Sequence, residues 1–213
     1  METSQPEIDR RNLNEDVERM RRIWVNEMNA PEILQYDEEM VSEMLEQLRN
    51  QQEYVDSVYE DRATLTEEKS FVNKLYQMEI DRLKYMVSSY LRTRLHKIEK
   101  YAFYILDNPV QTQKLSMKER NFAQQFVLLF ESHVNDLALS KFAADHRSLT
   151  SGDDNMVPEP NLDGFVFCQG KEEGGVQCDD KGGEFVQVTS ADRYVLRYQS
   201  VQEHVEAGTI DLI

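Results

Sequence analysis

Apolar residues recur every three or four positions over the first two-thirds of the chain, a pattern typical of amphipathic helices. A first helix is predicted to begin at a capping box formed by Asn12 and Glu15, and to end at Ala30-Pro31. A second helix is predicted to begin near Asp37, where acidic residues follow in the first turn. The amino-terminal part therefore indicates a helical domain.

The third predicted helix is the longest. It runs from about Thr66 to Leu106, because neither Gly nor Pro occurs between Thr64 and Pro109, and Thr64 with Glu67 has the spacing of a capping box. At 1.5 Å per residue it would be roughly 60 Å long, about twice the diameter of a small domain. We expect that one chain of this size does not cover such a helix along its whole length.

Two faces of this long helix are apolar. One face is a broad arc made of Val72, Leu75, Leu83, Met86, Val87, Tyr90, Leu91, Ile98 and Tyr101. The other is a stripe of residues seven apart, Phe71, Met78 and Tyr85. A helix with two apolar faces packs between neighbours, which can be helices of its own bundle or a partner protein. The length of the helix favours a partner.

A fourth helix is predicted from Ser116, where Glu119 completes a capping box, to about Phe142. Its predicted buried side consists of Phe122, Phe126, Leu129, Phe130, Val134 and Leu137. The composition then changes, because residues 146–160 are polar, contain prolines and lack periodicity, which indicates a linker. The predicted organisation is a helical domain over residues 1–145, this linker, and a small module over residues 161–213.

The carboxyl-terminal module has β-type segments rich in β-branched and aromatic residues: Phe165–Phe167, Phe185–Val188 and Tyr194–Tyr198. The Gly-rich segment Gly170–Gly183 is predicted to be a hairpin loop. One or two helical turns are predicted from Ser200 to Gly208, followed by a strand-like end, Thr209–Ile213. The fold class is therefore mainly α with a small β-rich module, which is marginal alone and needs a surface to dock on.

Charge argues against nucleic acid as the main partner, because the net charge is −16 and phosphate binding needs a positive surface. The charge is uneven. Residues 1–68 have 19 acids and 7 bases, a net charge of −12, whereas residues 69–106 have 8 bases and 3 acids, a net charge of +5. Either the acidic second helix neutralises the basic third one, or the basic helix faces an acidic partner. Both readings remain open.

No catalytic, cofactor or metal motif is present: the phosphate-binding Gly patterns, G-x-S-x-G and H-E-x-x-H are all missing from the sequence. Cys168 and Cys178 are ten residues apart, which favours neither a zinc site nor a disulfide framework. No segment has the apolar length of a signal peptide or a membrane span, so we expect a soluble intracellular protein without membrane contact. We expect no enzyme activity.

A DNA-contacting helix is the main alternative, on the basic segment Arg92–Lys97. However, Arg92 and Arg94 point about 200° apart on a helix, so they do not form one continuous stripe. A coiled-coil adaptor protein is the second alternative.

Residues 82–101, RLKYMVSSYLRTRLHKIEKY, resemble the signature of a known family, the SLD-five subunits of the GINS complex, also called GINS subunit four. Two further blocks agree in order. Trp24–Glu27 with Ala30–Leu34 resembles the first-helix motif, and Pro160–Phe167 with Gly208–Ile213 resembles the carboxyl-terminal module.

The resemblance implies a non-catalytic structural subunit. GINS is a heterotetramer of four related subunits, each with a helical A domain and a small β-rich B domain. It joins the MCM ring and the CDC-forty-five factor in the nucleus to form the eukaryotic replicative helicase, in which the MCM ring hydrolyses ATP. The implied partners are three sister subunits, the MCM ring and the CDC-forty-five factor, with DNA contact indirect at most.

We expect partner contacts on the long helix and on the carboxyl-terminal tail, with Trp24 bracing the long helix. The expected interface residues are Trp24, Met78, Tyr85, Tyr90, Leu91, Leu95, Ile98, Tyr101, Ile210, Leu212 and Ile213.

Overall fold

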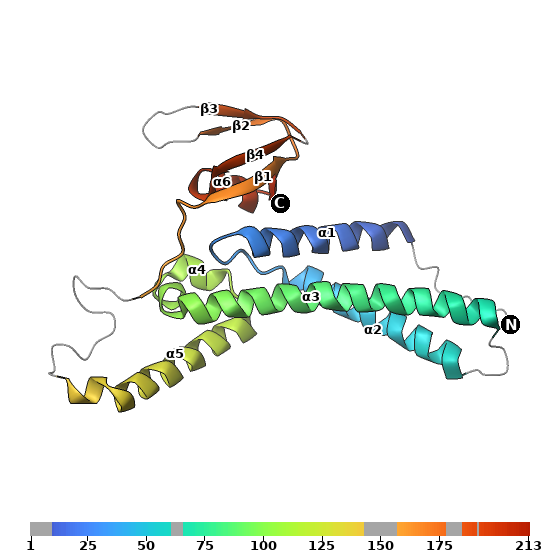
Figure 1. Ribbon diagram of the computed structural model, residues 1–213, viewed down its shortest axis with the longest axis horizontal. Coiled ribbons are helices and arrows are strands. Elements are labelled where there is room, and N and C mark those ends of the chain that lie inside the picture. The colour runs from blue at the N-terminus through green and yellow to red at the C-terminus, as the bar shows by residue number, and fades with distance from the viewer. Residues whose placement is uncertain (1–9, 61–65, 143–156, 178–184, 191) are drawn as a thin grey trace. The chain divides into compact units, whose positions relative to one another are not determined.

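A computed structural model describes residues 10–60, 66–142, 157–177, 185–190 and 192–213. The helices are α1 (Arg10–Asn29), α2 (Glu38–Glu60), α3 (Glu67–Asp107), α4 (Pro109–Gln113), α5 (Met117–Leu137), the 3-10 turn η1 (Leu139–Lys141) and α6 (Tyr198–Glu206). The strands are β1 (Phe165–Gly170), β2 (Gly174–Gln177), β3 (Phe185–Val188), β4 (Arg193–Arg197) and β5 (Ile210–Leu212) (Figure 1). The predicted fold class, mainly α with a small β-rich module, is confirmed.

The chain forms two compact units, which are described separately. The first comprises the described parts of residues 1–24 and 37–90, and the second comprises residues 25–36 and the described parts of residues 91–213. Among the described residues, no helix combines the length and the apolar composition needed to cross a bilayer.

The first unit contains α2 and the amino-terminal parts of α1 and α3. Asp37 caps α2, because its Oδ1 accepts a hydrogen bond of 3.0 Å from the Met40 amide. At the start of α3, the Thr66 hydroxyl accepts from the Lys69 amide at 3.3 Å. The predicted partner Thr64 lies outside the described residues. The helix α1 begins at Arg10, two residues before the predicted cap, so Asn12 lies inside the helix.

Apolar side chains on inward faces make the core of this unit, and hydrogen bonds join its helices. The buried residues are Met20, Met40, Val41, Met44, Leu48, Val55, Ile80, Leu83, Met86, Val87 and Tyr90. Buried Asn73 of α3 donates to the Val55 carbonyl of α2 at 2.9 Å, and Gln47 of α2 donates to Asp16 of α1 at 2.9 Å. The predicted broad apolar arc of the long helix is in part the core of its own bundle.

In the second unit, a short helix that the sequence pattern did not predict connects α3 to α5. Asn108 caps α4 by accepting from the Val110 amide at 3.0 Å, and Pro109 occupies the first turn. The predicted capping box of α5 is confirmed, because Ser116 and Glu119 bond each other's backbone amides at 3.2 and 2.9 Å. These helices share a core of Ile33, Ile98, Tyr101, Ile105, Leu115 and Ala123.

The carboxyl-terminal module also belongs to the second unit. An antiparallel sheet has the order β4-β1-β5, with Cys168 of β1 facing Tyr194 and Leu212, and β2 pairs with β3 in a hairpin (Figure 1). The predicted helical turns form α6. Gly208 follows them with a φ of 76°, a conformation that favours glycine. The strand-like end of the chain is β5.

The prediction of a loop over Gly170–Gly183 is wrong at its centre, where Gly174–Gln177 forms β2. Buried Val176 anchors this strand in the core. Gly175 leaves room for the Phe185 ring of β3, because a Cβ atom there would lie 1.6 Å from the ring. Residues 146–156 of the predicted linker lie outside the described residues.

A buried charge cluster and candidate interaction surfaces

Arg94 of α3 is completely buried, and every nitrogen of its guanidinium group donates hydrogen bonds within the chain. Its Nε and Nη2 donate to the two carboxylate oxygens of Glu119 at 2.7 and 3.0 Å. Its Nη1 donates to Glu27 at 2.9 Å and to the Leu34 carbonyl at 2.8 Å, and Nη2 also reaches the Lys114 carbonyl at 3.1 Å. A bidentate pair with further carbonyl acceptors is the geometry in which a buried guanidinium is well compensated.

Lys97 lies one turn further along α3 and belongs to the same cluster. Its ammonium group donates to the Glu27 carboxylate at 2.8 Å, to the Glu27 carbonyl, and to the Glu32 carbonyl at 2.7 Å. Burial lowers the pKa of Lys97, and the neighbouring Glu27 carboxylate opposes this shift. The cluster therefore fixes α3 to the end of α1 and to the segment that follows it.

Glu32 is the second centre of the cluster and is also buried. Its carboxylate accepts hydrogen bonds from Gln111 Nε2 at 2.8 Å, Lys114 Nζ at 3.4 Å, the Tyr198 hydroxyl at 2.9 Å and Gln202 Nε2 at 2.6 Å. Burial and the Glu32 charge together raise the pKa of Tyr198 well above its usual range. Tyr198 therefore stays protonated as a hydrogen-bond donor.

This cluster bears on both questions that the charge pattern left open. Two of the basic residues of the long helix, Arg94 and Lys97, are held inside the chain by Glu27 and Glu119. Those acids come from α1 and α5, whereas the sequence suggested α2 as the neutralising helix. Arg92 is exposed while Arg94 is buried, so the segment presents no continuous basic stripe, as its helical spacing predicts.

Within the described ranges, no His, Cys, Asp and Glu side chains gather in a way that could hold a metal ion.

The second apolar stripe of α3 is exposed along its length. Phe71, Met78 and Tyr85 are 63%, 67% and 63% exposed. Tyr85 makes an edge contact with Trp24, with ring centroids 6.3 Å apart, and Trp24 Nε1 donates to Ser89 at 3.1 Å. Trp24 thus braces the long helix as expected, and the stripe remains open to a partner.

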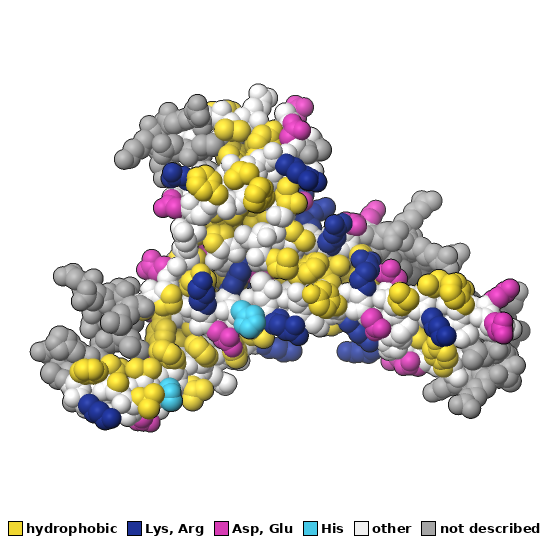
Figure 2. Space-filling model, in the orientation of Figure 1, with side chains coloured by type: hydrophobic (Ala, Val, Ile, Leu, Met, Phe, Trp, Pro, Cys, Tyr) yellow, Lys and Arg dark blue, Asp and Glu magenta, His cyan; other side chains and the backbone are white. Residues whose placement is uncertain are grey.

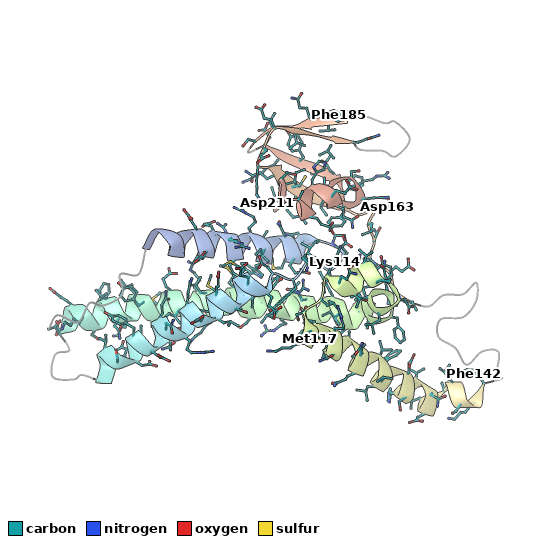
Figure 3. All side chains as sticks on the ribbon, turned by 180° about the vertical axis from the view of Figure 1, so that it is seen from behind. Lys114, Met117, Phe142, Asp163, Phe185 and Asp211 are labelled. Atoms are coloured by element: carbon teal, nitrogen blue, oxygen red, sulfur yellow. The ribbon has the colours of Figure 1, made fainter. Side chains whose placement is uncertain are left out.

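A second apolar surface lies on α5, which begins at Met117, with Phe142 directly after η1 (Figure 3). Phe126, Leu129, Phe130 and His133 line a shallow hollow on it, and the Phe126 and Phe130 rings stack at 6.2 Å. Figure 2 shows hydrophobic side chains gathered over this helix. The exposed large hydrophobic residues of α5 are Met117, Leu128, Leu129, Phe130 and Leu137, and Phe142 after η1 is also exposed. The sequence pattern assigned Leu129, Phe130 and Leu137 to a buried side, but within this chain they are uncovered.

The expected interface residues fall into two groups. Tyr90, Ile98, Tyr101, Ile210 and Leu212 are buried in the chain itself. We therefore assign these five to its own packing. Met78, Tyr85, Leu95 and Ile213 are exposed, and Trp24 and Leu91 are half-buried, so these six stay available for the interface.

The outer face of the carboxyl-terminal sheet is also apolar. Phe165 and Phe167 of β1 and Val195 of β4 are exposed, and register pairs Phe167 with Val195. Arg197 lies over the Phe165 ring at 5.9 Å.

Comparisons with known proteins match both parts of the chain. The model of the GINS complex protein helical bundle domain matches residues 35–138, and that of the DNA replication complex GINS protein SLD5 C-terminus matches residues 160–213. The chain is 36% identical to the DNA replication complex GINS protein SLD5 of Arabidopsis thaliana, over 93% of this chain and 91% of the relative. It is 32% identical to the Schizosaccharomyces pombe protein, over 89% and 88%, and 28% identical to the Homo sapiens protein, over 92% and 88%. The chain belongs to the SLD5 family of GINS proteins.

Proposed function

We propose that this chain is a non-catalytic structural subunit of a GINS complex and acts through its sister subunits. The observation that carries the proposal is the uncovered apolar surface of α5. Leu129 and Leu137 are 71% and 60% exposed, together with the neighbouring Phe130. Contiguous apolar surface of this kind marks interaction sites in soluble proteins. The relatives' names place those proteins in a DNA replication complex.

The proposal extends to the replication machinery. We expect the assembled complex to support the MCM-containing DNA helicase together with the CDC-forty-five factor in the nucleus, with ATP hydrolysis left to the MCM ring. Direct DNA binding is less well supported, because Arg94 and Lys97 form ion pairs within the chain and the net charge is −16.

Co-expression with the three sister subunits tests the proposal. In the double variant Leu129→Asp with Leu137→Asp, two charges enter the apolar surface, and we expect co-purification of the sister subunits to be lost. The matched control is Asn135→Asp, on the opposite side of α5, which should assemble normally. The Leu129 and Leu137 side chains are exposed, so the double variant should change the thermal unfolding of the chain itself little. Normal assembly of the double variant would contradict the proposal.

A further inference from the structure

The second unit contains an internal contact that the proposed function does not use. Residues 26–34, at the end of α1 and just after it, meet the carboxyl-terminal module. Ala30 belongs to the same buried core as Val166, Tyr198 and Leu212 of the module, and Leu34 packs against that core. Part of this contact is therefore apolar, and it joins segments that lie far apart in the sequence.

Glu32 supplies the polar centre of this contact. Two of its four donors, Gln111 and Lys114, come from α4 and the residue that follows it. The other two, Tyr198 and Gln202, come from α6 of the module. A carboxylate buried with too few partners is unfavourable, and two of the four donors to Glu32 are present only when α6 is in place.

Asn26 and Lys114 add contacts on either side of Glu32. Asn26 Oδ1 accepts from the Leu212 amide at 2.8 Å, and so protects the outer edge of β5, an edge strand of the sheet. Lys114 forms an ion pair of 2.7 Å with Glu206 of α6. Figure 3 labels Lys114 and Asp211, which lie on the two sides of this contact.

We propose that residues 26–34 form an internal docking seat for the carboxyl-terminal module, and that Glu32 is the latch that holds the module on it. The seat sets the position of the module within the chain, independently of any partner. Because the carboxylate and its donors can all bind water when they separate, the latch is reversible. A purely apolar contact would lack this directional centre.

Two backbone amides report docking separately from folding of the module. The Leu212 amide bonds only across the contact, to the Asn26 side chain, whereas the Lys171 amide bonds within the module, to the Thr209 carbonyl at 3.0 Å. Residue-resolved hydrogen exchange of the full-length chain therefore measures both events in one sample.

The decisive variant is Glu32→Ala, with Glu203→Ala on the exposed face of α6 as the matched control. We expect Glu32→Ala to speed exchange at Leu212 by about tenfold or more, since losing charged hydrogen bonds shifts an equilibrium by that amount. Exchange at Lys171 should stay unchanged, and Glu203→Ala should change neither amide. Equal acceleration at both amides, or none at Leu212, would overturn the proposal.

A milder variant covers the case in which Glu32→Ala does not fold. Gln202→Ala removes one donor from a partly exposed position of α6 and leaves Glu32 with three partners. We expect the same selective acceleration at Leu212, but smaller. Unchanged Leu212 exchange in this variant would also count against the latch.

Discussion

One carboxylate oxygen of Glu119 both caps α5 and binds Arg94 of α3. Glu119 Oε2 accepts from the Ser116 amide at 2.9 Å, as the capping box of α5 requires, and from Arg94 Nη2 at 3.0 Å. The start of α5 is therefore positioned against α3 by the same group that begins the helix. Because the guanidinium also binds Glu27, one residue of α3 holds two other helices.

Replacing Arg94 should strongly destabilise the chain. In Arg94→Met, Glu119 keeps a buried charge without its ion-pair partner, while Glu27 keeps only Lys97. Breaking a buried pair in this way costs about 3–5 kcal/mol. Arg94→Lys should recover little, because a lysine cannot reach both carboxylates and two carbonyls in the same plane. Urea unfolding measures the free energy of unfolding of each variant.

The matched control is Arg92→Met, two residues away on the exposed side of α3. It should change the free energy of unfolding by about 0.5 kcal/mol at most. If Arg94→Met unfolds with the stability of this control, the cluster does not stabilise the fold.

Helix positions were largely predictable from the sequence because they depend on local signals. The Ser116 and Glu119 box fixed the start of α5, and the spacing of Phe71, Met78 and Tyr85 correctly predicted a stripe outside the core. The helix α4 was missed because Asn108-Pro109 after a long helix resembles a simple stop. The strand β2 was missed because its glycines are typical of loops, and the close approach of the Phe185 ring, which explains Gly175, comes from the other strand of the hairpin.

The buried cluster was only weakly visible in the sequence. Arg94 lies on the same helical face as Leu91 and Ile98, and Glu27 lies three residues after Trp24. A charge on an apolar face is the signal for a buried pair, but it does not identify the partner. Glu32 follows a proline outside any helix, so no periodicity applied to it. Its donors are 79 to 170 residues away in the chain.

Truncation of two adjacent residues, Leu212 and Ile213, should reduce stability by very different amounts. Leu212, the last residue of β5, is 2% exposed, whereas Ile213, directly after the strand, is 41% exposed. Successive side chains along an extended chain point to opposite faces. Leu212→Ala should cost about 2–5 kcal/mol by leaving a cavity. Ile213→Ala should cost about 0.5 kcal/mol or less. Thermal unfolding of the two variants compares them directly, and similar losses would mean that Leu212 and Ile213 do not lie on opposite faces.

The exposed stripe of α3 should affect assembly and leave folding unchanged. We expect Phe71→Asp with Met78→Asp to reduce co-purification of sister subunits, since both side chains are exposed and uncharged in the native chain. Tyr90 is unsuitable for this test because it is completely buried, and Tyr85 already contacts Trp24.

Lys69→Asp is the control for this stripe, because it changes charge on a different face of the same helix. It should leave assembly intact. An intact complex with the double variant would remove this stripe of α3 from the interface and leave α5 as the proposed contact.

Alkaline pH should destabilise the native chain through Tyr198. Its ordinary pKa is about 10, and in the folded chain burial and the charges of Glu32, Glu206 and Glu27 raise the pKa further. Above pH ~10 the unfolded chain therefore loses a proton that the folded chain keeps. Stability then falls with rising pH, by about 1.4 kcal/mol per pH unit for this one group.

Comparison with Tyr198→Phe isolates this contribution. The variant loses the hydrogen bond to Glu32 and should be less stable at pH 7, but its stability should fall less steeply above pH ~10. Lys97 has a lowered pKa, so its contribution has the opposite sign, and it cancels because both proteins contain it. Tyr54→Phe, at an exposed tyrosine, should keep the native slope. Urea unfolding at several pH values measures all three, and equal slopes for the native chain and Tyr198→Phe would show that Tyr198 ionises as freely in the folded chain as in the unfolded one.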